Sequence, residues 1–221
     1  MTSPRLHPTV IALAVVSMLH DLAGDMVTPL LPALLATMGS GPAALGLIEG
    51  TADATGSLLK LVSGYVADRI GRLKTLTVLG YGVANVLRPL LGFTSAWWQV
   101  LAIRFGDRVG KGVRGSPRDA LVASVTTKES RGYAFGFHHA LESLGAVLGT
   151  VLGYILLSSG MTVRRVILWS VVPGVFTMLM VGFRVRADAV APAPAAVKVG
   201  IPPVTGFRRL LVAVVLFTLG N

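Results

Sequence analysis

Ionisable side chains recur inside long apolar segments of this chain, where a charge is costly. They are His20, Asp21, Asp25, Glu49, Asp53, Lys60, Arg88, Arg104, Asp107, Arg108, Lys111, Arg114, His138, His139 and Glu142. Charged groups buried in a lipid bilayer are normally paired and normally line a polar cavity. A carboxyl group beside an arginine in a dry cavity can also load and release a proton. The set therefore indicates a polar pathway through a membrane, although a buried ion pair that only fixes helix register is the alternative for any single residue.

The spacing of these residues predicts which of them face the same way. Residues four apart share one face of a helix, as do Asp21/Asp25, Glu49/Asp53, Arg104/Arg108, Asp107/Lys111 and His138/Glu142. A rise of about 1.5 Å per residue gives their depth in the membrane. A layer near the outer boundary then holds Asp25, Glu49 and Arg88, and a layer near the midplane holds His20, Asp21, Asp53, Arg108 and Glu142. Acids and bases are predicted to share layers, as neutralising pairs require.

These layers supply two groups of candidate site residues. The candidates for proton coupling are His20, Asp21, Asp25, Asp53 and Glu142. The candidates for counter-ions or for contacts with an anionic substrate are Arg88, Arg104, Arg108 and Lys111. The chain has no cysteine, and beyond the adjacent His138 and His139 its sequence shows no metal-ligand cluster and no nucleophile arrangement. We therefore expect no catalytic residue, no metal, no cofactor and no enzymatic activity.

Membrane-spanning helices are the elements that must position these residues. The sequence is 53% hydrophobic and 14% charged, whereas soluble domains carry about 25% charged residues. Stretches of roughly 20 apolar residues span a bilayer, and six are predicted, at about 9–36, 43–66, 75–93, 97–117, 132–158 and 164–184. The net charge of +10 would suit nucleic acid, but a basic nucleic-acid-binding domain would be hydrophilic. The predicted fold class is an all-α membrane protein, and its predicted partner is the lipid bilayer and not nucleic acid.

The basic residues outside the predicted spans indicate the orientation. One set of alternate loops holds Arg5, Arg69, Arg72, Lys74, Arg118, Lys128, Arg131, Arg184, Arg186, Lys198, Arg208 and Arg209. The opposite loops hold only Arg164 and Arg165. Because basic loops stay in the cytoplasm, both ends are predicted to be cytoplasmic. The expected domains are a cytoplasmic tail at 1–8, a six-helix bundle at 9–186, a cytoplasmic linker at 187–207 and the start of a seventh helix at 208–221.

Proline and glycine predict two local features of the helices. Pro29 and Pro32 lie in the outer part of the first span and can kink or end it. Gly145, Gly149 and Gly153 form a stripe of small residues along the fifth span. Such a stripe favours close packing against a neighbouring helix.

A short run between the second and third spans carries a family signature. The run reads Gly64-Tyr-Val-Ala-Asp68-Arg69-Ile-Gly71-Arg72-Leu-Lys74. It resembles the G-x-x-x-D-R-x-G-R-x-K signature of the major facilitator superfamily at all six fixed positions. The arginines can neutralise Asp68 and reach the carbonyl groups at the end of the helix. The resemblance implies a cytoplasmic gating role, by contact with the other half of the protein, for Gly64, Asp68, Arg69, Gly71, Arg72 and Lys74.

Looser matches to the same superfamily follow in the fourth and fifth spans. The run Arg108-Val-Gly-Lys111-Gly112 resembles its R-x-x-q-G motif, which implies a role in proton transfer for Arg108, with Arg104 as the alternative. The fifth span keeps the glycines of the family's antiporter signature but lacks its proline, which weakens the case for drug/proton antiport. The runs HDLAGDMVTPLLP and GDRVGKGVRGSPRDAL look like a bacterial subgroup whose members are described as exporters.

The resemblance implies both a fold and a function. The fold would be the N-terminal six-helix bundle of a two-bundle transporter, with the first and fourth helices lining a cavity and the second and fifth facing the second bundle. The predicted function is proton-coupled export of a small molecule by alternating access, in the bacterial inner membrane and together with a missing C-terminal six-helix bundle. The alternative is a half-length membrane protein, inactive alone or acting as a subunit beside a second bundle, because the sequence stops at Asn221 inside the expected seventh helix.

Overall fold

The regular structure of the described chain is helical throughout. The computed structural model describes residues 6–70 and 72–184, without the side chains of residues 61, 66–70 and 184. The elements are α1 (Pro8–Asp25), η1 (Thr28–Leu30), α2 (Leu31–Ala36), α3 (Pro42–Ile70), α4 (Leu73–Leu90), η2 (Leu91–Phe93), α5 (Trp97–Ser124), α6 (Arg131–Ser158), α7 (Val163–Trp169) and α8 (Val171–Arg184). The predicted all-α class is confirmed. The predicted linker at 187–207 and the seventh helix at 208–221 lie outside the described residues.

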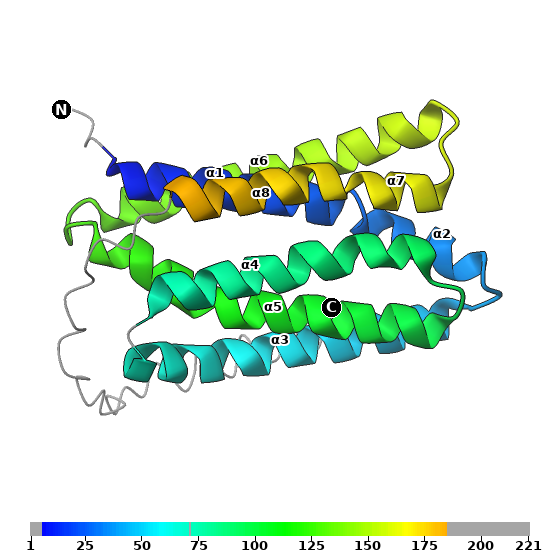
Figure 1. Cartoon of the computed structure of the whole chain (residues 1–221), viewed down its shortest axis with the longest axis horizontal. Coiled ribbons are helices and arrows are strands. Elements are labelled where there is room, and N and C mark those ends of the chain that lie inside the picture. The colour runs from blue at the N-terminus through cyan, green and yellow to red at the C-terminus, as the bar shows by residue number, and fades with distance from the viewer. Residues whose placement is uncertain (1–5, 71, 185–221) are drawn as a thin grey trace, which may run out of the picture. The chain divides into compact units, whose positions relative to one another are not determined.

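The helices form two packed groups joined along their length. Helix α1 packs against α6 and α8, and α5 packs against both α3 and α4, while α4 also contacts α8. Figure 1 shows α1, α6 and α8 along one side and α3, α4 and α5 along the other. The end of α3, the start of α4 and the link from α5 to α6 lie at the same end as the start of α1, on the left of Figure 1. Residues distant in sequence therefore come together at the same depth.

The described helices differ in how apolar they are. Four segments are long and apolar enough to cross a membrane, namely Pro8–Ala36, Leu73–Phe93, Arg131–Ser158 and Val163–Phe183. Helices α3 and α5 are equally long but carry several charged residues. Ion pairs between these two helices, and between α5 and α4, neutralise much of that charge inside the bundle. The outer faces of α6 and α8 expose large apolar side chains such as Tyr154 and Phe183, as lipid-facing surfaces do.

The first predicted span is broken where its prolines lie. Helix α1 ends at Asp25, a 3-10 turn at Thr28–Leu30 follows, and α2 begins at Leu31. Pro29 has no N–H to donate back along a continuous helix, so the chain tightens into the 3-10 turn. The Thr28 hydroxyl donates to the carbonyl oxygen of Gly24 at 3.1 Å, which also accepts from the Val27 N–H at 3.0 Å. The predicted kink is therefore confirmed.

The glycine stripe on α6 is a helix-packing surface. A Cβ atom added to Gly145 would meet the backbone carbonyl of Met18, and one added to Gly149 would meet that of Leu22. A Cβ atom on Gly153 would lie 3.1 Å from the carbonyl oxygen of Met26. The backbones of α1 and α6 thus touch at three points one helical turn apart. The prediction of close packing is confirmed, and this contact fixes the relative height of α1 and α6.

The helix that holds the fourth predicted span runs past the predicted edge of that span, at about residue 117. Helix α5 passes through Pro117 and continues to Ser124. A proline inside a helix costs about 3 kcal/mol, but the added turns bury Leu121 and Val122 and place Arg118 in the bundle. The prediction that Arg118 belongs to a cytoplasmic loop is therefore wrong. It is a buried residue of α5.

Candidate functional site

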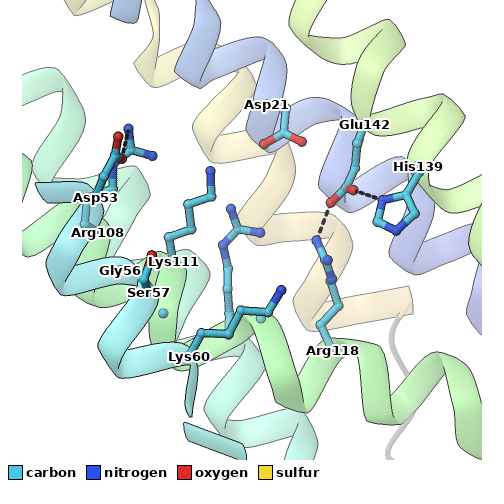
Figure 2. Close-up of a pocket in the computed structure, with 13 residues that line it drawn as sticks. Asp21, Asp53, Gly56, Ser57, Lys60, Arg108, Lys111, Arg118, His139 and Glu142 are labelled. Atoms are coloured by element: carbon cyan, nitrogen blue, oxygen red, sulfur yellow. Dashed lines mark hydrogen bonds and ion pairs between the residues drawn. The ribbon is translucent and has the colours of Figure 1, made fainter. Parts of the chain in front are cut away.

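A cavity of about 570 Å³ opens between α1, α3, α5 and α6 (Figure 2). Small residues on α3 and α5, such as Gly56, Ser57 and Gly115, leave room for it. Its ionisable lining residues are Asp21, Asp53, Lys60, Arg108, Lys111, Arg114, Arg118, His139 and Glu142. Lysines and arginines outnumber carboxylates in this lining, so the cavity is basic.

One wall of the cavity rests on a chain of ion pairs between α3 and α5. Arg104 donates two hydrogen bonds to the Glu49 carboxylate, from Nε at 3.0 Å and from Nη2 at 2.8 Å. Arg108 lies one turn further along α5 and reaches both Glu49, at 3.4 Å, and Asp53, at 3.2 Å. The predicted i, i+4 pairs thus do share a face, since the two acids of α3 meet the two arginines of α5. A two-pronged arginine–carboxylate contact also fixes geometry as well as charge.

A second ion-pair group joins α4 to α5 and α1 below this wall. Arg88 of α4 pairs with Asp107 at 3.0 Å, and both side chains are only 6% exposed. The same guanidinium donates to the backbone carbonyl of His20 at 3.1 Å and contacts the His20 ring at 3.2 Å. The other ring nitrogen of His20 contacts the Asn85 amide oxygen at 3.2 Å. Arg88 therefore ties three helices together in the interior.

A third polar group lies on the opposite wall of the cavity. Arg118 pairs with Glu142 of α6, and Glu142 also accepts a hydrogen bond from His139 at 2.7 Å (Figure 2). The buried His138 lies 3.5 Å from the same carboxylate and contacts Ser17 of α1 at 3.2 Å. The Ser17 hydroxyl in turn lies 2.7 Å from the hydroxyl of Tyr81 on α4. This group connects α1, α4, α5 and α6 at one depth.

The predicted candidates divide between two neighbouring cavities. Those that line the larger cavity are Asp21, Asp53, Glu142, Arg108 and Lys111. A small cavity of about 60 Å³ beside it is lined by His20, Asp25, Arg88 and Arg104, together with Asp21, Arg108 and Lys111. Each of the nine candidates from the two groups therefore lines at least one of these two cavities.

The predicted layers describe depth better than they describe partners. Within the described residues Arg88 pairs with Asp107, and not with the Asp25 or Glu49 assigned to its layer. Glu49 pairs instead with Arg104 and Arg108. The difference arises because depth in the membrane does not determine which helices are neighbours, and α4 packs against α5.

Several side chains of these polar groups are not among the predicted candidates. Glu49 and Asp107 belong to the predicted intramembrane charges but not to the candidate site residues, and Arg118 is predicted to lie in a loop. Ser17, Tyr81 and Asn85 carry no charge, so nothing in a charge-based search could have found them. Their common signal is a polar side chain in an apolar helix, on the same face as a charged neighbour.

The residues of the predicted gating signature are described only in part. Gly64 lies in α3, where an added Cβ atom would be 3.5 Å from the Ser116 hydroxyl of α5. Arg72 is the N-cap residue of α4, and Lys74 lies in its first turn. Gly71 and the side chains of Asp68 and Arg69 lie outside the described residues. The gating role of this signature stays a prediction.

The hydroxyl of Tyr81 offers a test of the third polar group. Tyr81→Phe removes the 2.7 Å contact with Ser17 and leaves the ring in place. Because Ser17 keeps its contacts to His138 and Arg118, we expect a loss of about 1 kcal/mol in unfolding free energy, the usual net value of one hydrogen bond. Thermal unfolding in detergent measures it, with Tyr133→Phe on the exposed start of α6 as control. Equal midpoints for the two variants would contradict the contact.

The chain is similar in sequence to a known protein family and to individual proteins. The sequence model described as Major Facilitator Superfamily matches residues 13–220. An uncharacterized MFS-type transporter of Methanocaldococcus jannaschii is 29% identical over 219 residues, which is 98% of this chain and 55% of that protein. An uncharacterized protein of Mycobacterium tuberculosis is 36% identical over 135 residues, 61% of this chain and 33% of that protein. The chain thus spans about half the length of the archaeal relative.

Solved structures show the same fold at low sequence identity. The crystal structure of the human organic anion transporter MFSD10 (TETRAN) has a TM-score of 0.66 at 18% identity, covering 86% of this chain and 51% of that one. An inward-facing, unoccupied bacterial homolog of the human lysosomal transporter Spinster has a TM-score of 0.65 at 18% identity, covering 78% and 41%. At this identity the likeness concerns the fold alone.

Proposed function

Because the chain belongs to the major facilitator superfamily, we propose that it acts as one bundle of a secondary transporter that exports a small molecule in exchange for protons. Membership in the family supports membrane transport, and no chemical conversion of the solute is part of the proposal. In transporters of this kind two six-helix bundles rock around a site near the middle of the membrane. The chain would supply one bundle and one half of that site.

The observation that carries the proposal is the charge-lined cavity of about 570 Å³. Buried charges are costly in a membrane and are retained where ions or polar solutes pass. Here they come from four helices and converge on one space, while the charges beside them are neutralised in pairs. The opposite wall would come from a second six-helix bundle, on a C-terminal half or on a second chain. The basic loops favour a cytoplasmic N-terminus in the plasma membrane of a bacterium.

The ion pairs of the cavity reduce the number of carboxylates that we propose as proton carriers. Asp53 faces Arg108, and Glu142 faces Arg118, so each has a permanent counter-ion. Asp21 and Asp25 form no ion pair with any residue in the described part of the chain, although cationic side chains line the cavities around them. A carboxyl group without a fixed partner can change its protonation state without breaking the bundle. We therefore rank Asp21, which lines both cavities, above Asp53 and Glu142.

The Asp21→Asn variant tests this proposal. The protein is reconstituted in proteoliposomes together with its second bundle, and a pH gradient is imposed. This gradient should drive solute transport coupled to proton movement, and a pH-sensitive dye measures the proton movement. Asp21→Asn should reduce this coupled flux to the level of empty liposomes, because an amide carries no exchangeable acidic proton. Folding should persist, because Asp21 has no ion pair to lose within the described residues. Undiminished proton-driven flux in Asp21→Asn would remove this residue from the mechanism.

Glu129→Gln serves as the matched control for this experiment. Glu129 lies in the link between α5 and α6 and is exposed. The substitution removes one carboxylate, as Asp21→Asn does, without touching the cavity. Its flux should equal that of the unchanged protein. A solute flux that ignores the pH gradient in every variant would favour uniport over proton coupling.

A further inference from the structure

The charge balance of the larger cavity is uneven once its ion pairs are set aside. Arg108 is paired with Asp53, and Arg118 is paired with Glu142. The remaining charged residues of the lining are three cations, Lys60, Lys111 and Arg114, and one carboxylate, Asp21. Within the lining of the larger cavity three cations therefore face one carboxylate, an excess of two positive charges, while Asp25, which also has no ion pair in the described chain, lines the small cavity beside it.

Arg114 is the least compensated member of this set. Arg114 is only 3% exposed, yet its side chain forms no ion pair and no hydrogen bond with any described side chain. The guanidinium carbon lies 4.5 Å from the centre of the Tyr81 ring, a cation–π contact, and the Nε atom is buried without an acceptor. A buried guanidinium without a carboxylate is costly, and an anion brought into the cavity would offset that cost.

Lys60 and Lys111 reach the same space from two different helices. Figure 2 shows both ammonium ends extending into the cavity between Arg108 and Arg118. Neither lysine forms an ion pair with the residues that the structure describes. Gly115 leaves space beside Lys60, since the three atoms nearest to an added Cβ atom there would be methylene carbons of Lys60, at 3.7 Å or more. Two mobile ammonium groups beside a fixed guanidinium can follow anionic groups of differing shape.

We propose that Lys60, Lys111 and Arg114 bind the negative groups of the transported solute, and that this solute is a small organic dianion. The inference rests on the proposed function, because it takes the cavity as the transport site. Two negative charges would neutralise the excess of the lining, and a neutral or cationic solute would increase the electrostatic cost. Carboxylates and phosphate monoesters share this chemistry, and the probes below distinguish them.

Equilibrium binding to the chain together with its second bundle, in lipid nanodiscs, tests the inference. The probes are succinate as a dicarboxylate, glycerol 3-phosphate as a phosphate monoester, choline as a cation and glycerol as a neutral solute, each followed by calorimetry. At least one of the two dianions should bind saturably, while choline and glycerol should not. The better dianion identifies the anionic group that the site prefers.

The double variant Lys60→Gln/Lys111→Gln should weaken binding of that dianion at least about tenfold, which corresponds to about 1.4 kcal/mol. Both side chains are exposed in the cavity and unpaired within the described chain, so folding should persist. The matched control is Lys128→Gln/Arg165→Gln, which removes the same total charge from exposed positions outside the cavity. Its affinity should stay within about twofold of the unchanged protein, because distant exposed charges are screened.

Three results would each overturn the inference. They are equal affinities in the cavity and control double variants, tighter binding of choline than of either dianion, and the absence of saturable binding by both dianions. The proposed function is tested separately by the Asp21→Asn flux experiment. Intact binding with no proton-driven flux would remove the function and leave the anion site. Proton-driven flux without dianion binding would do the reverse.

Discussion

Asp107→Asn should lower the free energy of unfolding of the bundle by about 3–5 kcal/mol, the usual cost of breaking a buried ion pair from one side. The carboxylate accepts from Arg88 at 3.0 Å and lies 3.7 Å from Arg104, and all three side chains are 6% exposed or less. Asparagine keeps the shape but loses the charge. It would leave Arg88 with a positive charge in the interior, next to an Nε atom that already has no acceptor.

To measure this effect, the purified protein is heated in detergent, and size-exclusion chromatography then gives the fraction that remains folded at each temperature. Asp119→Asn is the matched control on the same helix, since Asp119 pairs with Arg118 at 2.9 Å but is 32% exposed. A partly exposed pair of this kind contributes about 1 kcal/mol or less. The double variant Arg88→Met/Asp107→Leu removes both charges and should recover much of the lost stability. Equal losses in Asp107→Asn and Asp119→Asn would show that the Arg88–Asp107 pair does not hold the helices together.

Gly149→Leu should prevent α1 and α6 from packing and should abolish the yield of folded, monodisperse protein. An added Cβ atom at this position would overlap the carbonyl oxygen of Leu22 and lie 3.0 Å from its carbonyl carbon. Backbone atoms cannot rotate aside as a flexible side chain can. Overpacking inside a protein costs typically about 1–3 kcal/mol where side chains can adjust, so a backbone clash in the middle of the helix pair should cost more.

Gly136→Leu is the control for this packing prediction. Gly136 lies on the same helix, but an added Cβ atom there meets nothing within 4 Å. This variant should express and elute like the unchanged protein. Gly149→Ala should fall between the two, because it adds the Cβ atom without the rest of the side chain. Normal yield and normal elution of Gly149→Leu would mean that the backbones of α1 and α6 do not meet at this point.

The helices were predictable because lipid imposes a simple rule on sequence. A span needs about 20 apolar residues, and four segments of the described chain meet this rule by length and hydropathy, whereas α3 and α5 carry several charged residues. The end of α5 did not follow, since Pro117 is a standard sign of helix termination. In the structure the pairing of Arg118 with Glu142 and the burial of Leu121 and Val122 outweigh that sign. Such tertiary contacts cannot be seen in a local pattern.

The polar site was predictable in its membership more than in its connections. Charge in an apolar helix is sufficient to single out residues such as Asp21 and Arg108, which the structure places around one cavity. Choosing the partner of Arg88 needs the lateral order of the helices and their rotation. That order depends on contacts such as those between Gly80 of α4 and Gly110 of α5, where an added Cβ atom would lie 2.6 Å from a backbone oxygen. Glycine spacing alone does not say which helix will be met.

The two partners of each ion pair between α3 and α5 are also synthesised at different times. Glu49 and its partner Arg104 are 55 residues apart, so at about 5–20 residues per second the ribosome makes the acid roughly 3–11 s before the base. During that interval α3 carries a carboxylate whose guanidinium partner has not yet been made. We therefore expect insertion of α3 to be completed late, together with α5.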